Sequence, residues 1–176
     1  MPIRDHHLSR RGFLAASSAS GVAAFAGGPS SAETASDNTF RYEVSRSEEE
    51  WRDMLSEAEY KILRDGQTEL PLTSELVSEE RDGTYACRGC DLPVYLSNWK
   101  VPLDKGWVFF AHGVPNSVLL GIDGPQRVYG MGADFPNLIE THCRRCGSHL
   151  GHILLVDGEV LHCINGTSLT FSPSEA

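Results

Sequence analysis

The first regular pattern of polar and apolar residues begins at Ser47. Ser47 and Glu50 form the Ser-x-x-Glu pattern of a capping box, in which a hydroxyl and a carboxylate satisfy backbone N–H groups that a helix leaves unpaired. Apolar residues then recur at helical spacing. Ser56 and Glu59 repeat the pattern before a second apolar set, and Gly66 suits the end of that helix. The pattern predicts two short helices ahead of the main domain.

From Gly83 onward, the helical spacing gives way to short β-rich runs between Gly, Pro, Asn and Asp residues, a pattern typical of strands. Five such runs are residues 84–86, 93–96, 117–120, 159–164 and 168–171. A chain of 176 residues can bury the core of one domain, and its length does not favour a second. The pattern predicts a mainly β domain over residues 42–173, with antiparallel sheets and short N-terminal helices.

The N-terminus has the pattern of a targeting segment. Arg10-Arg11 stand just before Phe13 and a run of small apolar residues, 14–28. Paired arginines ahead of such a run resemble a twin-arginine (Tat) signal, which exports folded proteins. The run is shorter than the ~20 residues of a membrane-spanning helix, and a short anchor or a basic tail are the alternatives. We expect a signal peptide over residues 1–32, a linker over 33–41, a periplasmic or otherwise extracytoplasmic location, and no stable membrane insertion after cleavage.

The chain is acidic, with a formal net charge of −9. Nucleic-acid binding depends on basic residues that release phosphate counterions, so this charge excludes nucleic acid as an expected partner. The acidity mainly implies solubility. Because the sequence shows no extended apolar stripe, we expect a monomer.

The five cysteines form two Cys-x-x-Cys pairs and one single residue. The pairs are Cys87 with Cys90 and Cys143 with Cys146, and this spacing lets a tight turn aim two sulfurs at one ion. Zinc takes four such ligands tetrahedrally, and a closed four-sulfur site leaves no position for substrate or activated water. One pair alone could be a redox dithiol or a disulfide, but two pairs in a small domain favour a metal. The spacing predicts a structural zinc site.

Cys163 is the thiol that remains once the metal cysteines are assigned. A single thiol in an exported protein is either buried and inert or kept for its reactivity. His149 and His152 follow Cys146 closely, so the zinc site would hold them rigidly. Histidine is the usual general acid near neutral pH. The residues leave a thiol enzyme and an inert core cysteine as alternatives.

Two C-terminal motifs resemble the signature of the methionine-R-sulfoxide reductase B family. They are Cys-Gly-Ser-His-Leu-Gly-His at residues 146–152 and Cys-Ile-Asn-Gly-Thr-Ser-Leu-Thr-Phe at residues 163–171. Further matches occur in the family's order at Glu50-Trp51 and at residues 60–64, 73–76, 83–87 and 106–107. The resemblance covers residues 40–173, and its independent motifs make it specific.

The resemblance implies a zinc-stabilised β-tent fold and an oxidoreductase that repairs oxidised methionine in proteins or peptides as part of an oxidative stress response. Cys163 is implied to attack the sulfoxide sulfur of the R epimer and to become a sulfenic acid. His149, His152 and Asn165 are implied to bind and protonate the departing oxygen. These roles are chemically coherent, since a thiolate is a strong nucleophile and the oxygen leaves only when it is protonated.

The aromatic segment departs from the family's pattern. Trp107 and Phe110 are implied to form the substrate-binding wall that receives the methyl group, but Val108-Phe109 replace the usual proline and serine between them. Leu161 stands where the family usually has an arginine, and a missing guanidinium removes an electrostatic aid to the thiolate. His162 is a weak substitute, because adjacent residues on a strand point to opposite faces.

The chain also lacks the family's common resolving cysteine, since Lys105 occupies that position. Every other cysteine besides Cys163 belongs to the predicted zinc site. We therefore expect a one-cysteine enzyme whose sulfenic acid is reduced by an external thiol, such as a thioredoxin-like partner.

Two non-enzymatic alternatives remain. A binding module would keep the zinc and an aromatic cage without reducing sulfoxides, as the related cereblon ligand-binding and Yippee-type domains suggest. The missing arginine favours this alternative. A binding module, however, has no need of the set Cys163, His149, His152 and Asn165. A purely structural domain would make Cys163 an inert core thiol, which native-state thiol labelling distinguishes.

Overall fold

The computed structural model describes residues 40–124, 126–127, 134–135 and 137–175. The predicted export signal, residues 1–32, lies outside this range, as does most of the predicted linker, so both stay predictions. Among the described residues, no helix has the length and hydropathy needed to cross a membrane.

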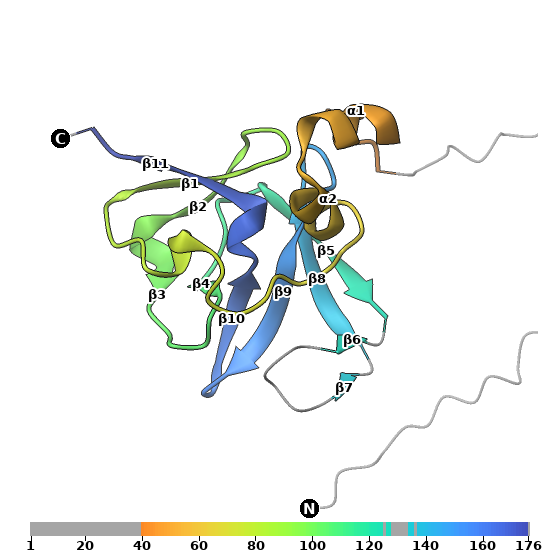
Figure 1. The fold of residues 1–176 in the computed structure, drawn as a ribbon. Helices are drawn as coiled ribbons and strands as arrows, with labels where there is room; N and C mark the ends of the chain where they lie inside the picture. The colour runs from red at the N-terminus through yellow and green to blue at the C-terminus, as the bar shows by residue number, and fades with distance from the viewer. Residues whose placement is uncertain (1–39, 125, 128–133, 136, 176) are drawn as a thin grey trace, which may run out of the picture. The chain divides into compact units, whose positions relative to one another are not determined.

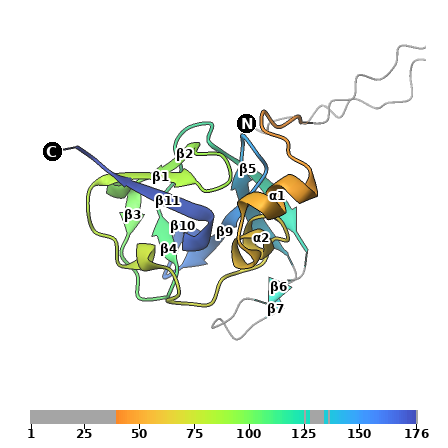
Figure 2. The ribbon, with the colours of Figure 1, turned by 45° about the horizontal axis from the view of Figure 1, so that its top comes forward.

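Two short helices begin the described part of the chain, as the capping boxes predict. α1 spans Glu48–Met54 and α2 spans Glu57–Leu63, and both capping boxes are formed. Isolated helices of this length are not stable in water, so tertiary packing holds them. They bury Trp51 and Leu63 in the core, and they lie together beside β9 on one flank of the molecule (Figures 1 and 2).

Most of the remaining described residues belong to antiparallel strands in two main sheets and a small ribbon (Figure 1). The three-stranded sheet has the order β11 (Leu169–Pro173), β1 (Gly83–Cys87), β2 (Pro93–Leu96). The six-stranded sheet has the order β3 (Lys100–Val101), β4 (Val108–Phe110), β10 (Glu159–Ile164), β9 (His149–Val156), β8 (Leu138–Cys143), β5 (Val118–Asp123). The ribbon pairs β6 (Gln126–Arg127) with β7 (Asp134–Phe135). The described part of the chain also contains three 3-10 turns: η1 (Glu75–Val77), η2 (Ser97–Trp99) and η3 (Gly166–Ser168). The predicted mainly β fold, with antiparallel sheets and short N-terminal helices, is confirmed.

β8 and β9 lie inside the six-stranded sheet, although the sequence pattern predicts neither strand. β9 begins at His149, so the His-Leu-Gly-His motif is part of a strand and not a loop after the second cysteine pair. Histidine and glycine are weak strand formers, and the motif has no alternation of polar and apolar residues. The conformation comes from pairing with β8 on one side and β10 on the other.

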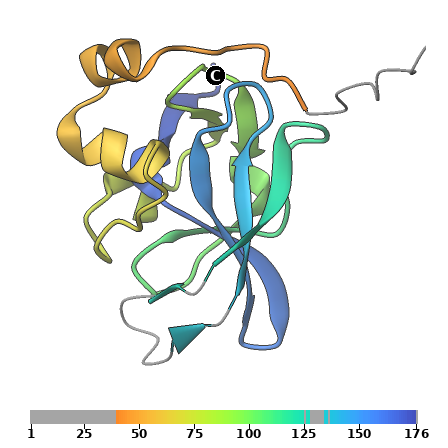
Figure 3. The ribbon, with the colours of Figure 1, turned by 90° about the vertical axis from the view of Figure 1, so that its right-hand side faces the viewer.

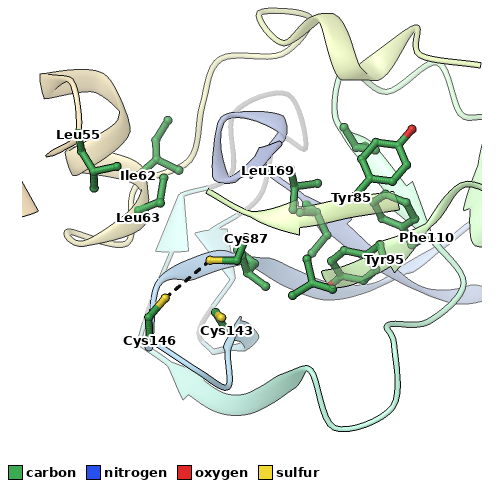
Figure 4. Close-up of a cluster of buried hydrophobic side chains, with 14 of the residues drawn as sticks. Leu55, Ile62, Leu63, Tyr85, Cys87, Tyr95, Phe110, Cys143, Cys146 and Leu169 are labelled. Atoms are coloured by element: carbon green, nitrogen blue, oxygen red, sulfur yellow. Dashed lines mark hydrogen bonds between the residues drawn. The ribbon is translucent and has the colours of Figure 1, made fainter. Parts of the chain in front are cut away.

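The main hydrophobic core joins the two helices to both sheets. Figure 4 shows Leu55, which follows α1, and side chains of α2 near the cysteines and the aromatic residues of β1, β2 and β4. A second, smaller cluster lies on the opposite face of the six-stranded sheet: Trp107, Phe109, Leu138, Leu154, Val156 and Leu161. Cys163 is half-buried against this second cluster, so its thiol faces away from the main core.

Candidate active site and metal centre

The four paired cysteines come together at the point where the two main sheets meet. Cys87 ends β1 and Cys143 ends β8, while Cys90 and Cys146 lie in the turns that follow. All four sulfurs lie within 4.8 Å of one another. The Sγ atoms of Cys87 and Cys146 are 3.7 Å apart, and those of Cys90 and Cys143 are 3.5 Å apart. A tetrahedral zinc with ligands at about 2.3 Å requires sulfurs about 3.8 Å apart, so the cluster fits a closed zinc site.

The two metal turns have matching backbone geometry. The N–H of Asp91 donates to the carbonyl of Cys87, and the N–H of Gly147 donates to that of Cys143, each at 2.8 Å. Asp91 and Gly147 both have positive φ angles, of 57° and 70°. This conformation brings both sulfurs of a Cys-x-x-Cys pair to the same side of the turn, and glycine adopts it without strain. The repeated spacing read from the sequence is therefore a repeated structure.

Cys163 lies in the middle of the six-stranded sheet, on β10. Its register partners are His152 on β9 and Phe109 on β4. Residues that are directly paired share a face of the sheet, so these three side chains lie side by side. Gly151 allows this close packing, because a Cβ at that position would lie only 2.1 Å from the carbonyl oxygen of Cys163. The His-Leu-Gly-His motif therefore needs glycine at this position, because the backbone of β10 leaves no room for a side chain.

Each histidine of the motif is oriented by a carboxylate from a different strand. Nδ1 of His149 donates to Glu140 on β8 at 2.7 Å, and Nε2 of His152 donates to Asp123 on β5 at 3.0 Å. The two imidazole rings are 5.1 Å apart at their centroids. These contacts fix which ring nitrogen each histidine presents to a ligand, namely Nε2 of His149 and Nδ1 of His152. Glu140 and Asp123 cannot be identified from local sequence, since only strand pairing brings them to the motif.

His149 keeps one polar atom buried without a protein partner. Its Nε2 atom has no hydrogen bond and no exposed surface. Leaving a buried polar group unpaired costs about 1 to 3 kcal/mol, so such an atom calls for an explanation. Because Nδ1 donates to Glu140, Nε2 of a neutral His149 is an acceptor, and it becomes a donor to a substrate oxygen beside Cys163 once it takes up a proton.

Burial sets the protonation of the site. It raises the pKa of the Cys163 thiol to about 12, with a smaller contribution from the negative charge of Glu69. Burial also lowers the pKa of His152, although its hydrogen bond to Asp123 opposes this effect. His142, and His149 through its hydrogen bond to the carboxylate, hold the pKa of Glu140 well below its usual range. The resting site therefore holds a neutral thiol beside a neutral His152 and an ionised Glu140.

Asn165 follows β10 and is buried. Its Nδ2 atom donates to the carbonyl of Leu150 at 3.2 Å, and its Oδ1 atom accepts from the N–H of Glu69 at 3.0 Å. One N–H of the amide is left for a ligand. Asn165 thus joins β9 to the segment that contains Glu69.

Glu69 is a buried residue that the sequence analysis did not identify. Its carboxylate accepts hydrogen bonds from the N–H of Gly166 at 2.7 Å and from the N–H and hydroxyl of Thr167 at 2.8 and 2.6 Å. Its carbonyl oxygen accepts from Nε1 of Trp107 at 3.2 Å. One residue therefore fixes Asn165, the turn after β10 and the predicted aromatic wall. No local pattern marks Glu69, because its partners lie far away in the sequence.

Replacing Glu69 by glutamine is expected to lower the free energy of unfolding by about 2 to 3 kcal/mol, because an amide cannot accept the same charge-assisted hydrogen bonds from Gly166 and Thr167. Urea unfolding followed by circular dichroism measures the loss. Glu80→Gln is the matched control, since Glu80 is exposed. Equal stability of the two variants would contradict a role for the buried carboxylate.

Of the two predicted aromatic contacts, the structure brings only Trp107 to the Cys163 face. Trp107 belongs to the second cluster with Phe109. Phe110 lies in the main core, stacked on Tyr95 with ring centroids 4.3 Å apart. Adjacent strand residues point to opposite faces, so Phe109 takes the place predicted for Phe110. Phe110 stabilises the core, and its placement gives it no contact with a substrate at Cys163.

The two residues before Cys163 also separate by face. Leu161 is buried in the second cluster on the same face as Cys163, where it surrounds the thiol with hydrocarbon. His162 faces the main core, and its Nδ1 atom shares a hydrogen bond with the hydroxyl of Tyr95 at 3.0 Å. His162 therefore does not replace the arginine that is missing at position 161.

Comparisons with known proteins agree with the site. The SelR domain family matches residues 55–173. Peptide methionine sulfoxide reductase B3 of Arabidopsis thaliana is 36% identical over 136 residues, which cover 74% of this chain and 72% of that protein. Peptide methionine sulfoxide reductase MsrB of Leifsonia xyli subsp. xyli is 36% identical over 140 residues, covering 76% and 94%. The same enzyme of Alteromonas mediterranea is 35% identical over 136 residues, covering 74% and 89%.

The family match covers more than half of the chain and contains all four metal cysteines, both motif histidines and Cys163. The three relatives, one from a plant and two from bacteria, are all named peptide methionine sulfoxide reductases of the B type. The chain belongs to the SelR domain family, the methionine sulfoxide reductases B.

Proposed function

We propose that this chain is a peptide-methionine (R)-S-oxide reductase that uses Cys163 as its nucleophile. The observation that carries the proposal is the row formed by Cys163, His152 and Phe109, with the unpaired Nε2 atom of His149 buried nearby. A thiol, an imidazole pair and an apolar wall are the groups that sulfoxide reduction needs. A binding module would gain nothing from a buried thiol and two oriented imidazoles, so the site favours the enzyme.

The reaction transfers one oxygen atom. The Cys163 sulfur attacks the sulfoxide sulfur, the S–O bond of the substrate breaks, and the oxygen ends on Cys163 as a sulfenic acid. The substrate sulfur is reduced by two electrons and the Cys163 sulfur is oxidised by two. The thiol proton ends on the transferred oxygen, and His152 and His149 can carry it there. No net proton is needed, which suits a site whose resting thiol is neutral.

Selection of one epimer follows from shape. The sulfoxide sulfur carries an oxygen, a methyl group and the substrate chain, and the site separates polar from apolar contacts. The oxygen is placed toward the imidazoles, and the methyl group toward Trp107 and Phe109 in the second cluster. The opposite epimer would exchange these groups and bury its oxygen against hydrocarbon, which costs free energy.

The sulfenic acid must then be reduced by a thiol from outside the chain. Of the five cysteines, only Cys163 lies outside the metal cluster, so the chain offers no resolving thiol. Two equivalents of a monothiol or one dithiol restore Cys163 and release water. The natural substrate is then oxidised methionine in proteins or peptides, and the partner is a thioredoxin-like or other thiol reductant.

The direct test is turnover of R and S epimers of a dabsylated methionine sulfoxide, assayed separately with dithiothreitol. We expect reduction of the R epimer alone and at least a 1,000-fold lower rate for Cys163→Ser, because nucleophile removal typically costs about that much or more. The Cys163→Ser protein must retain its zinc and its circular dichroism spectrum. Absence of turnover by folded, zinc-loaded wild type would rule out the enzyme.

We propose further that the chain is exported to the periplasm by the Tat pathway. Support comes from Arg10-Arg11, from Phe13 and from the small apolar run after them. Arg10→Lys with Arg11→Lys is expected to leave most of the protein unprocessed in the cytoplasm, with Arg4→Lys as the control. Cell fractionation followed by immunoblotting measures both, and normal export of the double variant would contradict this route.

A further inference from the structure

One face of the six-stranded sheet carries a group of exposed aliphatic side chains. Ile122, Ile139 and Ile153 form one register row across β5, β8 and β9, three strands that lie side by side (Figure 3). Leu155 and Val160 are paired on β9 and β10, on the same face. We call the group the aliphatic patch: Leu120, Ile122, Ile139, Ile153, Leu155 and Val160.

Most of the aliphatic patch is open to solvent. The exposed fractions are 58% for Leu120, 76% for Ile122, 42% for Ile139, 72% for Leu155 and 65% for Val160. Singly exposed aliphatic residues are ordinary, but a contiguous group rarely stays uncovered in a soluble protein. The register contacts above make this group contiguous.

Charge is segregated between the two faces of the sheet. On β5 and β8, Asp123 and Glu140 point to the Cys163 face, where they hold the histidines. On the other face of these two strands, the patch positions are Leu120, Ile122 and Ile139. In a chain with a net charge of −9, the six residues of the aliphatic patch carry no charge. Electrostatic repulsion between two copies of an acidic chain is therefore weaker at the aliphatic patch than at its charged surroundings.

We propose that the aliphatic patch is covered by a second copy of this chain, in a two-fold dimer whose sheets pack face to face. Each of the five exposed side chains offers roughly 100 Å² of apolar area. Two copies would remove about 1,000 Å² from water, which reaches the lower bound for a specific interface. A two-fold axis sets the same patch against itself, and aliphatic sheet faces are self-complementary in this arrangement.

The dimer leaves the active site open, because Cys163 lies on the opposite face of the sheet from the aliphatic patch. It also replaces the monomer predicted from the sequence. That prediction rested on the absence of an apolar stripe, and the stripe becomes visible only when four strands are aligned. The patch residues come from separate parts of the chain, which no local pattern connects.

Sedimentation velocity of the full, zinc-loaded chain between about 1 and 100 μM tests the proposal. We expect wild type to shift toward the dimer mass as concentration rises. Ile122→Lys with Leu155→Lys is expected to weaken the dimer at least 100-fold, because two charges would be buried without partners. Met54→Lys is the matched control, since Met54 is an exposed apolar residue on α1. All variants must keep the wild-type zinc content and circular dichroism spectrum.

Either of two results would overturn the proposal. One is a wild type that stays monomeric at about 100 μM, including the case in which the aliphatic patch instead captures an unfolded, oxidised protein. The other is a dimer that the double lysine variant forms as readily as wild type. Thiol-dependent turnover is measured in parallel, because loss of the dimer with unchanged activity separates this proposal from the reductase assignment.

Discussion

Replacing Cys146 by serine is expected to unfold the domain, whereas replacing Cys163 by serine leaves it folded. Cys87 and Cys90 come from the turn between β1 and β2, and Cys143 and Cys146 from the turn between β8 and β9. The metal therefore ties the three-stranded sheet to the six-stranded sheet. Without it, three buried thiols and one half-buried thiol would crowd a site built for a cation.

The expected loss is large on the scale of domain stability. Structural zinc sites contribute about 10 to 16 kcal/mol of apparent binding free energy, while a domain is typically stable by about 5 to 15 kcal/mol. Cys146→Ser should show no cooperative thermal transition and no bound zinc, and chelation of wild type should give the same result. Thermal melting followed by circular dichroism, with metal analysis, measures both. A wild-type melting temperature that survives complete chelation would contradict a structural role for the cluster.

The features that the sequence predicts correctly in this chain are those set by residues only a few positions apart. The capping box of Ser47 and Glu50 needs only two residues three positions apart, and it is formed as predicted. The cysteine pairs likewise encode their turns locally, so the cluster could be assigned before the fold was known. Cys163 is identified as the remaining thiol because the other four cysteines form the predicted metal site.

The features that the sequence does not predict depend on contacts between segments that are far apart in the chain. The family resemblance predicts Phe110 as a substrate contact, whereas the register with β10 pairs Phe109 with Cys163, and this register cannot be read from the local sequence. Asp123 and Glu140 reach the histidines only through the alignment of β5, β8 and β9. Glu69 bonds to residues more than ninety positions away, so its role comes entirely from tertiary structure.

The pKa of Cys163 gives the second large prediction. Because burial raises this pKa to about 12, the folded protein holds a neutral thiol at pH 7. Thiolate forms only as the pH approaches that value, so native-state alkylation by iodoacetamide should accelerate roughly tenfold per pH unit from pH 7 to about 11. A labelling rate that levels off near pH 9 would contradict the effect of burial. A rate limited by global unfolding would instead identify an inert core thiol.

Leu161→Arg should restore the electrostatic aid that the family's usual arginine provides. Residue 161 lies two positions before Cys163 on the same face, where hydrocarbon now surrounds the thiol. A nearby cation lowers the pKa of a thiol by about 1 pH unit or more, so labelling at pH 8 should rise at least tenfold. Val160→Arg is the matched control, because it adds the same charge on the opposite face of β10. If both variants accelerate labelling equally, the effect is one of net charge or loosened packing and not of a guanidinium beside the thiol.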